Sequence, residues 1–87
     1  MFKLNQNYPN PFNPTTNVAF SLSAANFTTL KVYNILGQEV ATLFSGMADG
    51  GRMYVVNFDA SQLGNGVYFY RLASGSQVDV RKMTLLK

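Results

Sequence analysis

Residues 66–87, GVYFYRLASGSQVDVRKMTLLK, are the stretch that decides the fold of this 87-residue chain. Large apolar residues recur at every second position between Val67 and Leu72, which is the period of a strand with one buried face. A glycine-containing turn, Ser74 to Ser76, follows, and a second apolar strand runs from Val78 to Leu86. The stretch therefore predicts an antiparallel hairpin.

The register of this hairpin can be predicted from its turn. Pairing Leu72 with Val78 gathers the apolar residues on one face, namely Tyr68, Tyr70, Leu72, Val78 and Val80. The same register places Lys82 opposite Tyr68 on that apolar face. We therefore expect a β-bulge near Arg81–Lys82 that turns the Lys82 side chain outward.

The rest of the chain repeats short strands and glycine turns. Alternating polarity predicts strands over 17–22, 30–33, 40–43 and 54–58, with turns at 34–37 and 48–51 and a loop over 59–66. Pairing across the first turn puts Val32 near Val40 and Tyr33 near Glu39. Because no segment predicts a long amphipathic helix, we expect an all-β fold, an antiparallel β-sandwich of about seven strands formed by residues 1–87 as one domain.

A proline-rich segment precedes the first of these strands. Pro9, Pro11 and Pro14 each lack a backbone donor, so the segment cannot form a central strand and should run along an edge or cap one end. We expect Phe12 to plug that end of the sandwich. An interdomain linker is the other interpretation, but Tyr8 and Phe12 favour packing because large aromatic side chains are usually buried.

Composition limits what the chain can bind. It has no cysteine and no histidine, so we expect no disulfide and no metal site. The core must come from hydrophobic residues, which make up 47% of the chain. The net charge is +3 and the basic residues are scattered, so we expect no nucleic-acid partner. No apolar run has the length of a membrane span, so we expect no membrane insertion.

Catalytic chemistry has few residues to draw on. The acidic residues Glu39, Asp49, Asp59 and Asp79 fall in different turns and strands, which argues against a paired-carboxylate site. Serine and threonine hydroxyls have no histidine to act as their base. We therefore expect that the chain is not an enzyme and uses no cofactor.

Three aromatic residues suggest another kind of site. Tyr33, Tyr54 and Phe69 could form a platform on which sugar rings stack. The alternative is that each ring packs on a sheet face or pairs with a neighbour, and scattered surface aromatics are ordinary. Three exposed rings in a row would favour the carbohydrate site, and packed rings would argue against it.

Four segments taken together carry a family resemblance. They are NYPNPFNPTT at 7–16, LKVYNILGQEV at 30–40, GVYFYRL at 66–72 and KMTLLK at 82–87. In this order, the chain resembles the type A C-terminal sorting domain of the type IX secretion system, found on secreted proteins of Bacteroidota. The resemblance runs from Leu4 to Lys87, and each motif is weak when taken alone.

The resemblance implies an Ig-like β-sandwich that acts as a non-catalytic sorting signal. Its partners would be a cargo protein, the type IX translocon and a cell-surface peptidase, with transit through the periplasm to the cell surface or outside. We expect this chain to be a fragment of a longer secreted protein, because Met1–Leu4 leads into polar residues and not into a signal peptide. The alternative is a structural or surface-attachment module of a secreted hydrolase, with weak carbohydrate binding.

The resemblance also implies where recognition takes place. The family's features map onto Pro9, Asn10, Pro11, Phe12, Gly66, Tyr68, Arg71 and residues 82–87. Within the last segment we expect recognition through Lys82, Leu85, Leu86 and Lys87, read from backbone groups on the strand edge and from alternate side chains. The alternative is that Met83 and Leu85 only close the core. Exposed edge strands also allow a dimer by strand pairing.

Overall fold

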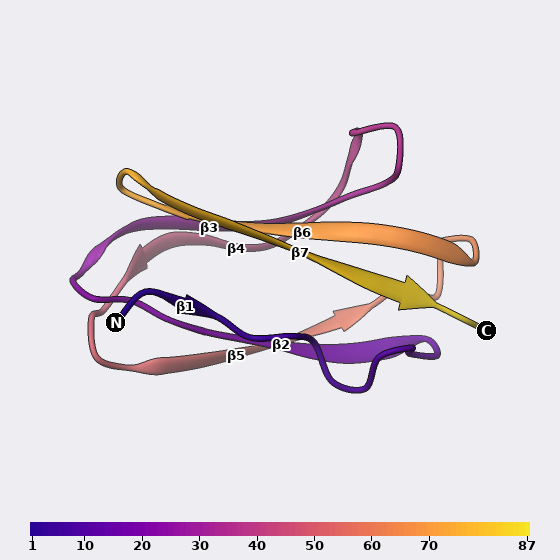
Figure 1. Ribbon diagram of the computed structural model, residues 1–87, viewed down its shortest axis with the longest axis horizontal. Coiled ribbons are helices and arrows are strands. Elements are labelled where there is room, and N and C mark those ends of the chain that lie inside the picture. The colour runs from indigo at the N-terminus through magenta and orange to yellow at the C-terminus, as the bar shows by residue number, and fades with distance from the viewer.

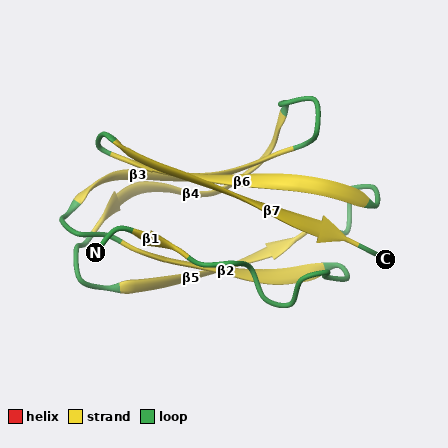
Figure 2. Ribbon diagram, viewed as in Figure 1, coloured by secondary structure: helices red, strands yellow, loops and turns green.

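The computed structural model describes residues 1–87, which form seven strands and no helix (Figure 2). The strands are β1 (Lys3–Leu4), β2 (Thr15–Ser21), β3 (Asn26–Tyr33), β4 (Glu39–Ala48), β5 (Met53–Asp59), β6 (Gly66–Ser74) and β7 (Gln77–Leu85). The sequence predicts all of them except β1, which is too short to show a period. The all-β prediction is confirmed.

The strands form two antiparallel sheets stacked face to face (Figure 1). One sheet has the order β1-β2-β5, and the other has the order β4-β3-β6-β7. This is the predicted Ig-like sandwich. β7 is an edge strand of the larger sheet, and its last residues lie at the end of the molecule opposite the N-terminus (Figure 1).

The core lies between the inward faces of the two sheets. Phe20 on β2 stacks on Tyr54 of β5, with ring centroids 5.2 Å apart and planes 8° from parallel. Phe44 of β4 meets both rings edge-on, at 5.5 Å from each. These three rings join the sheets near one end, while aliphatic side chains and Tyr70 fill the centre. Because each buried aliphatic or aromatic side chain contributes about 1.5–3 kcal/mol, this core is the main source of stability.

The hairpin of β6 and β7 has a different register from the predicted one. Ser74 pairs with Gln77 across a two-residue turn, Gly75-Ser76, and Leu72 pairs with Asp79. The predicted turn was one residue longer. Since side chains alternate between faces, a shift of one residue exchanges the two faces of β7. Gly75 has φ +58°, a value that suits the tight turn.

The observed register accounts for which side chains of β7 point into the core, and it needs no bulge. Pairing runs without interruption to Gly66–Leu85, so the bulge expected near Arg81–Lys82 is absent. Met83 and Leu85 point into the core and are fully buried. Val78 and Val80, predicted to be inside, lie on the outer face and are each 49% exposed. Lys82 also lies on the outer face, opposite Phe69 and not opposite Tyr68.

The β3–β4 hairpin matches its prediction only next to the turn. Tyr33 pairs with Glu39 as predicted, but Val32 pairs with Ala41 and not with Val40. The register shifts between these two pairs, and it shifts again further along the hairpin. Such bulges increase the local twist, and they make the free edge of β4 a poor template for another strand.

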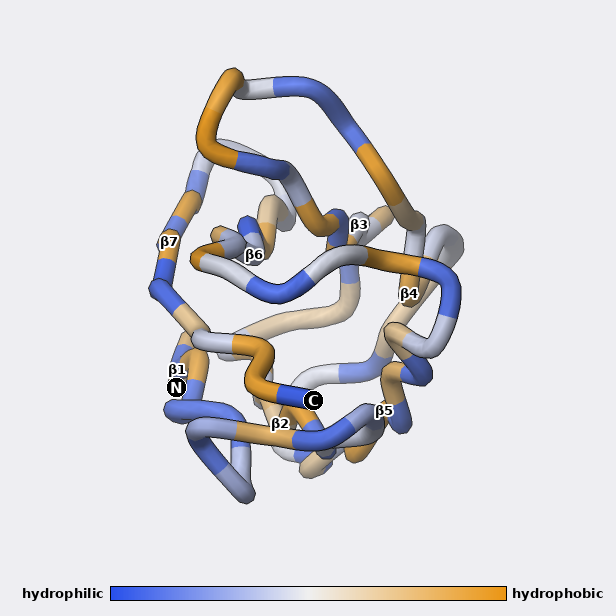
Figure 3. Tube along the Cα trace, turned by 90° about the vertical axis from the view of Figure 1, so that its right-hand side faces the viewer, coloured by the Kyte–Doolittle hydropathy of each residue, from blue (hydrophilic) through white to orange (hydrophobic).

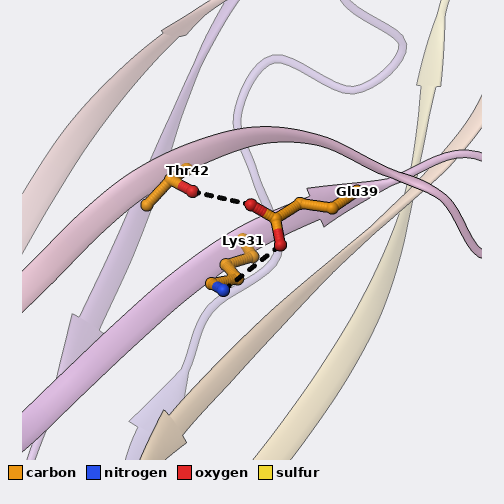
Figure 4. A network of polar contacts seen from close by, with 3 residues as sticks. All are labelled: Lys31, Glu39 and Thr42. Atoms are coloured by element: carbon orange, nitrogen blue, oxygen red, sulfur yellow. Dashed lines mark hydrogen bonds and ion pairs between the residues drawn. The ribbon is translucent and has the colours of Figure 1, made fainter.

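Polar contacts hold the start of β4 against β3 (Figure 4). The Glu39 carboxylate accepts a 2.9 Å hydrogen bond from the Thr42 hydroxyl and lies 3.2 Å from the Lys31 ammonium (Figure 4). The Thr42 hydrogen bond, followed by the Lys31 contact, lowers the pKa of the Glu39 carboxyl. The pair is exposed to solvent, so it orients the strand more than it stabilises the fold.

Gly75→Ala is expected to lower the free energy of unfolding by about 1–2 kcal/mol, because an L-residue is strained at positive φ. An added Cβ would also lie 2.5 Å from Nδ2 of Asn26, which would have to move. Gly64→Ala is the matched control, since its Cβ would meet nothing within 4 Å. Urea unfolding of both variants measures the difference, and equal losses would contradict the assigned turn.

Candidate functional site

The proline-rich segment runs beside the last residues of β7. The backbone N–H of Phe12 donates to the carbonyl of Thr84, and the N–H of Leu86 donates to the carbonyl of Phe12, both at 3.0 Å. Phe12 thereby forms a parallel bridge with Leu85. The segment follows an edge, as predicted, and that edge belongs to the C-terminal strand.

The side chains of Asn10 and Gln6 also bond to the backbone of this edge of β7, next to the bonds made by Phe12. The N–H of Thr84 donates to Oδ1 of Asn10 at 3.1 Å, and Nε2 of Gln6 donates to the carbonyl of Lys82 at 2.8 Å. Together with the Phe12 bonds, these contacts use the outward backbone groups of β7 between Lys82 and Leu86. Another strand could pair with this half of the edge only by displacing residues 6–12.

The prediction for Phe12 is confirmed, and the one for Tyr8 is wrong. Phe12 is 2% exposed and packs against Phe58, with ring centroids 6.1 Å apart. Tyr8 is 80% exposed, although its backbone pairs with Asn17 in both directions at 3.0 Å. Successive side chains of an extended segment point to opposite sides, and Asn7 takes the inward position, so Tyr8 points outward.

Asn7 anchors the segment from inside and is a residue that the sequence analysis missed. Its side-chain amide donates to the Thr16 hydroxyl at 3.0 Å and to the Pro9 carbonyl at 3.1 Å. Its backbone N–H donates to the Tyr70 hydroxyl at 2.8 Å, and that hydroxyl donates to the Asn5 carbonyl at 2.8 Å. Asn7 lies within the 7–16 motif, but nothing in the motif shows that a polar residue would be buried.

Tyr70 connects this segment to the centre of the four-stranded sheet. The side chain is fully buried, and its hydroxyl has both a donor and an acceptor partner. Burial raises the pKa of the Tyr70 hydroxyl, and the hydrogen bond from the Asn7 N–H opposes that rise in part. A buried hydroxyl with both partners present stabilises the fold, whereas losing one partner would be costly.

The last residue, Lys87, is tied to the loop between β5 and β6. The backbone N–H of Lys87 donates to Oδ1 of Asn65 at 2.8 Å, and its ammonium donates to the Ser61 carbonyl at 2.9 Å. The same loop is held from inside by the Tyr68 hydroxyl, which donates to the Gly64 carbonyl at 2.7 Å. The proline-rich segment, this loop and the chain end therefore form one surface, called here the terminal surface.

The structure brings most of the predicted recognition residues to the terminal surface. Exposed on it are Pro9, Asn10, Pro11, Leu86 and Lys87. Phe12, Tyr68 and Leu85 lie beneath it with their side chains buried, and Gly66 pairs with Leu85 at its border. Arg71 and Lys82 are set apart, because both side chains lie on the outer face of the four-stranded sheet.

The three aromatic residues considered as a sugar platform do not form a row. Tyr54 packs in the aromatic cluster with Phe20, and its hydroxyl accepts a hydrogen bond from the Asp49 N–H at 2.8 Å. Tyr33 and Phe69 lie opposite each other on β3 and β6. Each ring thus packs or pairs with a neighbour, as the alternative interpretation predicts.

The remaining candidates for chemistry are dispersed. No three acidic residues lie close enough together to hold a metal ion, and the surface has no pocket of ligand size. The Asp59 carboxylate accepts a 2.9 Å hydrogen bond from the Ser61 N–H, which lowers the pKa of that carboxyl. The structure contains no helix that could cross a membrane.

Comparison with known families adds an independent observation. A family model described as the secretion system C-terminal sorting domain matches residues 6–86. The match includes the proline-rich segment, every strand from β2 to β7, and Leu86. No curated protein matches the chain.

Proposed function

We propose, since the chain belongs to the family of type IX secretion system C-terminal sorting domains, that residues 1–87 act as one sorting domain. Members of this family are signal modules, and the family implies a cargo protein that is exported to the cell surface or outside. The chain would accompany its cargo through the periplasm to the translocon. A surface peptidase would then remove it.

The observation that best supports this proposal concerns the last three residues, of which one is buried in the core and two lie at the surface. Leu85 is fully buried, while Leu86 is 54% exposed and Lys87 is held in place by Asn65 and Ser61. A receptor that handles many cargoes must read a feature that varies little in shape. The ordered chain end beside Pro9–Pro11 is such a feature.

The covered edge of β7 favours recognition through side chains. Residues 6–12 already use the outward backbone groups from Lys82 to Leu86. A receptor that added a strand here would first have to displace them, so we expect it to contact the exposed side chains instead. Pairing between two copies of the chain would be restricted to the Gln77–Arg81 half of this edge, and we expect such a dimer to be weak.

The decisive experiment removes the exposed residues and leaves the buried one. A fluorescent protein fused ahead of this chain, behind a signal peptide, is expressed in a bacterium with the type IX apparatus. Deleting Leu86–Lys87 is expected to abolish export and trap the fusion in the periplasm. The Leu85 side chain remains in the core of this variant, but the hydrogen bonds that Leu86 makes to Phe12 and Lys87 makes to Asn65 and Ser61 are lost. The melting temperature of the variant is therefore measured alongside, and its export is compared with the intact fusion only at temperatures at which it is folded.

Two results would count against the proposal. Export of the Leu86–Lys87 deletion at the level of the intact fusion would exclude the chain end as the signal. Periplasmic retention of the intact fusion would exclude the sorting role itself. Binding of the isolated chain to polysaccharide in a pull-down would then favour a surface-attachment module.

A further inference from the structure

The turn between β3 and β4 presents two large aliphatic side chains to solvent. Ile35 is 72% exposed and Leu36 is 78% exposed. Turns of this kind usually carry polar residues, glycine or proline. Figures 1 and 3 show the turn rising beyond the four-stranded sheet, on the side away from the other sheet, with hydrophobic residues at its crest.

This turn is held in one conformation without any partner. Oδ1 of Asn34 accepts hydrogen bonds from the N–H groups of Leu36, at 2.9 Å, and Gln38, at 3.0 Å. The Asn34 amide also donates to Oε1 of Gln38 at 2.8 Å, and the N–H of Gly37 donates to the Asn34 carbonyl at 3.0 Å. Because the turn is already ordered, burying Ile35 and Leu36 against a partner would cost little conformational entropy.

The outer face of the four-stranded sheet lies directly next to this turn. Tyr33, the residue before it, lies opposite Phe69, which in turn lies opposite Lys82. The next row along the strands pairs Lys31 with Arg71. Tyrosine and arginine are among the residues that are enriched at the energetic centre of protein interfaces.

The charge of this face is unbalanced. Lys31 is paired with Glu39, which is the one acidic residue among the rows that flank the turn. Arg71 and Lys82 form no ion pair within the chain. The face therefore carries two uncompensated cations beside two aromatic rings, which suits an acidic surface and not a basic one.

We infer that the turn and this outer face form one docking surface for a protein of the export machinery. The partner would have an apolar pocket for Ile35 and Leu36 and acidic groups opposite Arg71 and Lys82. This inference rests on the sorting role proposed above and adds to it a second contact surface, distinct from the terminal surface. A protein fits better than a bilayer, because a rigid two-residue crest matches a pocket, whereas membrane surfaces bind extended apolar faces.

Two double variants test the two halves of the surface. Ile35→Ser with Leu36→Ser removes the apolar crest, and Arg71→Glu with Lys82→Glu reverses the charge of the face. The fluorescently labelled chain is sedimented with outer-membrane vesicles from a bacterium that has the type IX apparatus. Each variant is expected to weaken this binding by at least about tenfold, as loss of an interface centre does.

Matched controls carry the same changes elsewhere. Val55→Ser alters an exposed aliphatic residue on β5, and Lys3→Glu reverses an exposed charge on β1. Both controls should stay within about twofold of the wild-type affinity, as remote surface substitutions usually do. Circular dichroism melting confirms that each variant is folded. Arg71→Lys keeps the charge and should retain most of the binding if Arg71 acts through electrostatics.

The outcomes separate this inference from the sorting role. Wild-type binding by both folded double variants would overturn it. Equal binding to protease-treated vesicles, or to vesicles of phosphatidylglycerol alone, would also overturn it, because the ligand would then be a glycan or a lipid. In the fusion assay, if the wild type and both variants are all exported, the docking surface is rejected but the sorting role stands. If the wild type itself is not exported, the sorting role is rejected.

Discussion

Phe12→Ala is expected to lower the free energy of unfolding by about 3–5 kcal/mol, the usual cost of emptying a buried aromatic site. Phe12 is 2% exposed, contacts Phe58, and bonds to β7 through both its N–H and its carbonyl. The cavity would open the end of the sandwich where the chain ends. Since domains are stable by only about 5–15 kcal/mol, the variant should lose a large part of its stability.

Urea unfolding monitored by circular dichroism measures this loss. Phe27→Ala is the control, because it makes the same change at a phenylalanine that is 55% exposed and should cost far less. A loss below about 1 kcal/mol for Phe12→Ala, the size of an ordinary surface effect, would contradict the assignment of Phe12 as a plug. The variant should also be exported less than wild type, since the terminal surface depends on that plug.

Tyr70→Phe is expected to cost about 1–3 kcal/mol at neutral pH, because it leaves buried backbone groups without a partner. The hydroxyl donates to the Asn5 carbonyl and accepts from the Asn7 N–H, both at 2.8 Å. No solvent reaches Tyr70, so water cannot replace either bond without a local rearrangement. The loss should loosen residues 5–7, which amide hydrogen exchange at Asn7 would detect.

Tyr70 should also make the domain sensitive to alkaline pH. Burial raises the pKa of its hydroxyl above that of an unfolded tyrosine, which is about 10. As the pH rises through about 10, the unfolded chain therefore loses this proton first, and the stability that Tyr70 contributes falls. Below that pH the contribution is fully present.

Stability against pH distinguishes this effect from general alkaline unfolding. Wild type and Tyr8→Phe, which changes an 80% exposed tyrosine, should lose stability in parallel above about pH 10. Tyr70→Phe should start lower and lose less over the same range. Parallel curves for all three proteins would show that the Tyr70 hydroxyl does not titrate differently in the folded state.

The register of the β6–β7 hairpin was mispredicted from the sequence because the length of its turn is ambiguous. The residues Ser74 to Ser76 allow a two-residue or a three-residue turn, and each choice sends a different set of β7 side chains inward. Met83 and Leu85 lie inside because the shorter turn pairs them with the inward face of β6. Val78 and Val80 are as apolar but lie outside, because this register places them on the face of β7 that points away from the smaller sheet.

The proline-rich segment shows a second kind of limit. That Phe12 is buried follows from its type and from its flanking prolines. Which strand edge it covers depends on contacts with Thr84 and Leu86, far away in the chain. The burial of Asn7 depends in the same way on Thr16 and Tyr70, and no local pattern records such partners.

Local periodicity was sufficient to identify strands β2 to β7 and the sandwich, because alternation of polarity reflects one-sided burial directly. The four ordered motifs were sufficient to suggest a sorting domain. Long-range packing decided the rest: the register of β7, the cover over its edge, and the separation of the terminal surface from the outer face with Arg71 and Lys82. These depend on distant contacts whose energies differ by only a few kcal/mol, which residue order does not display.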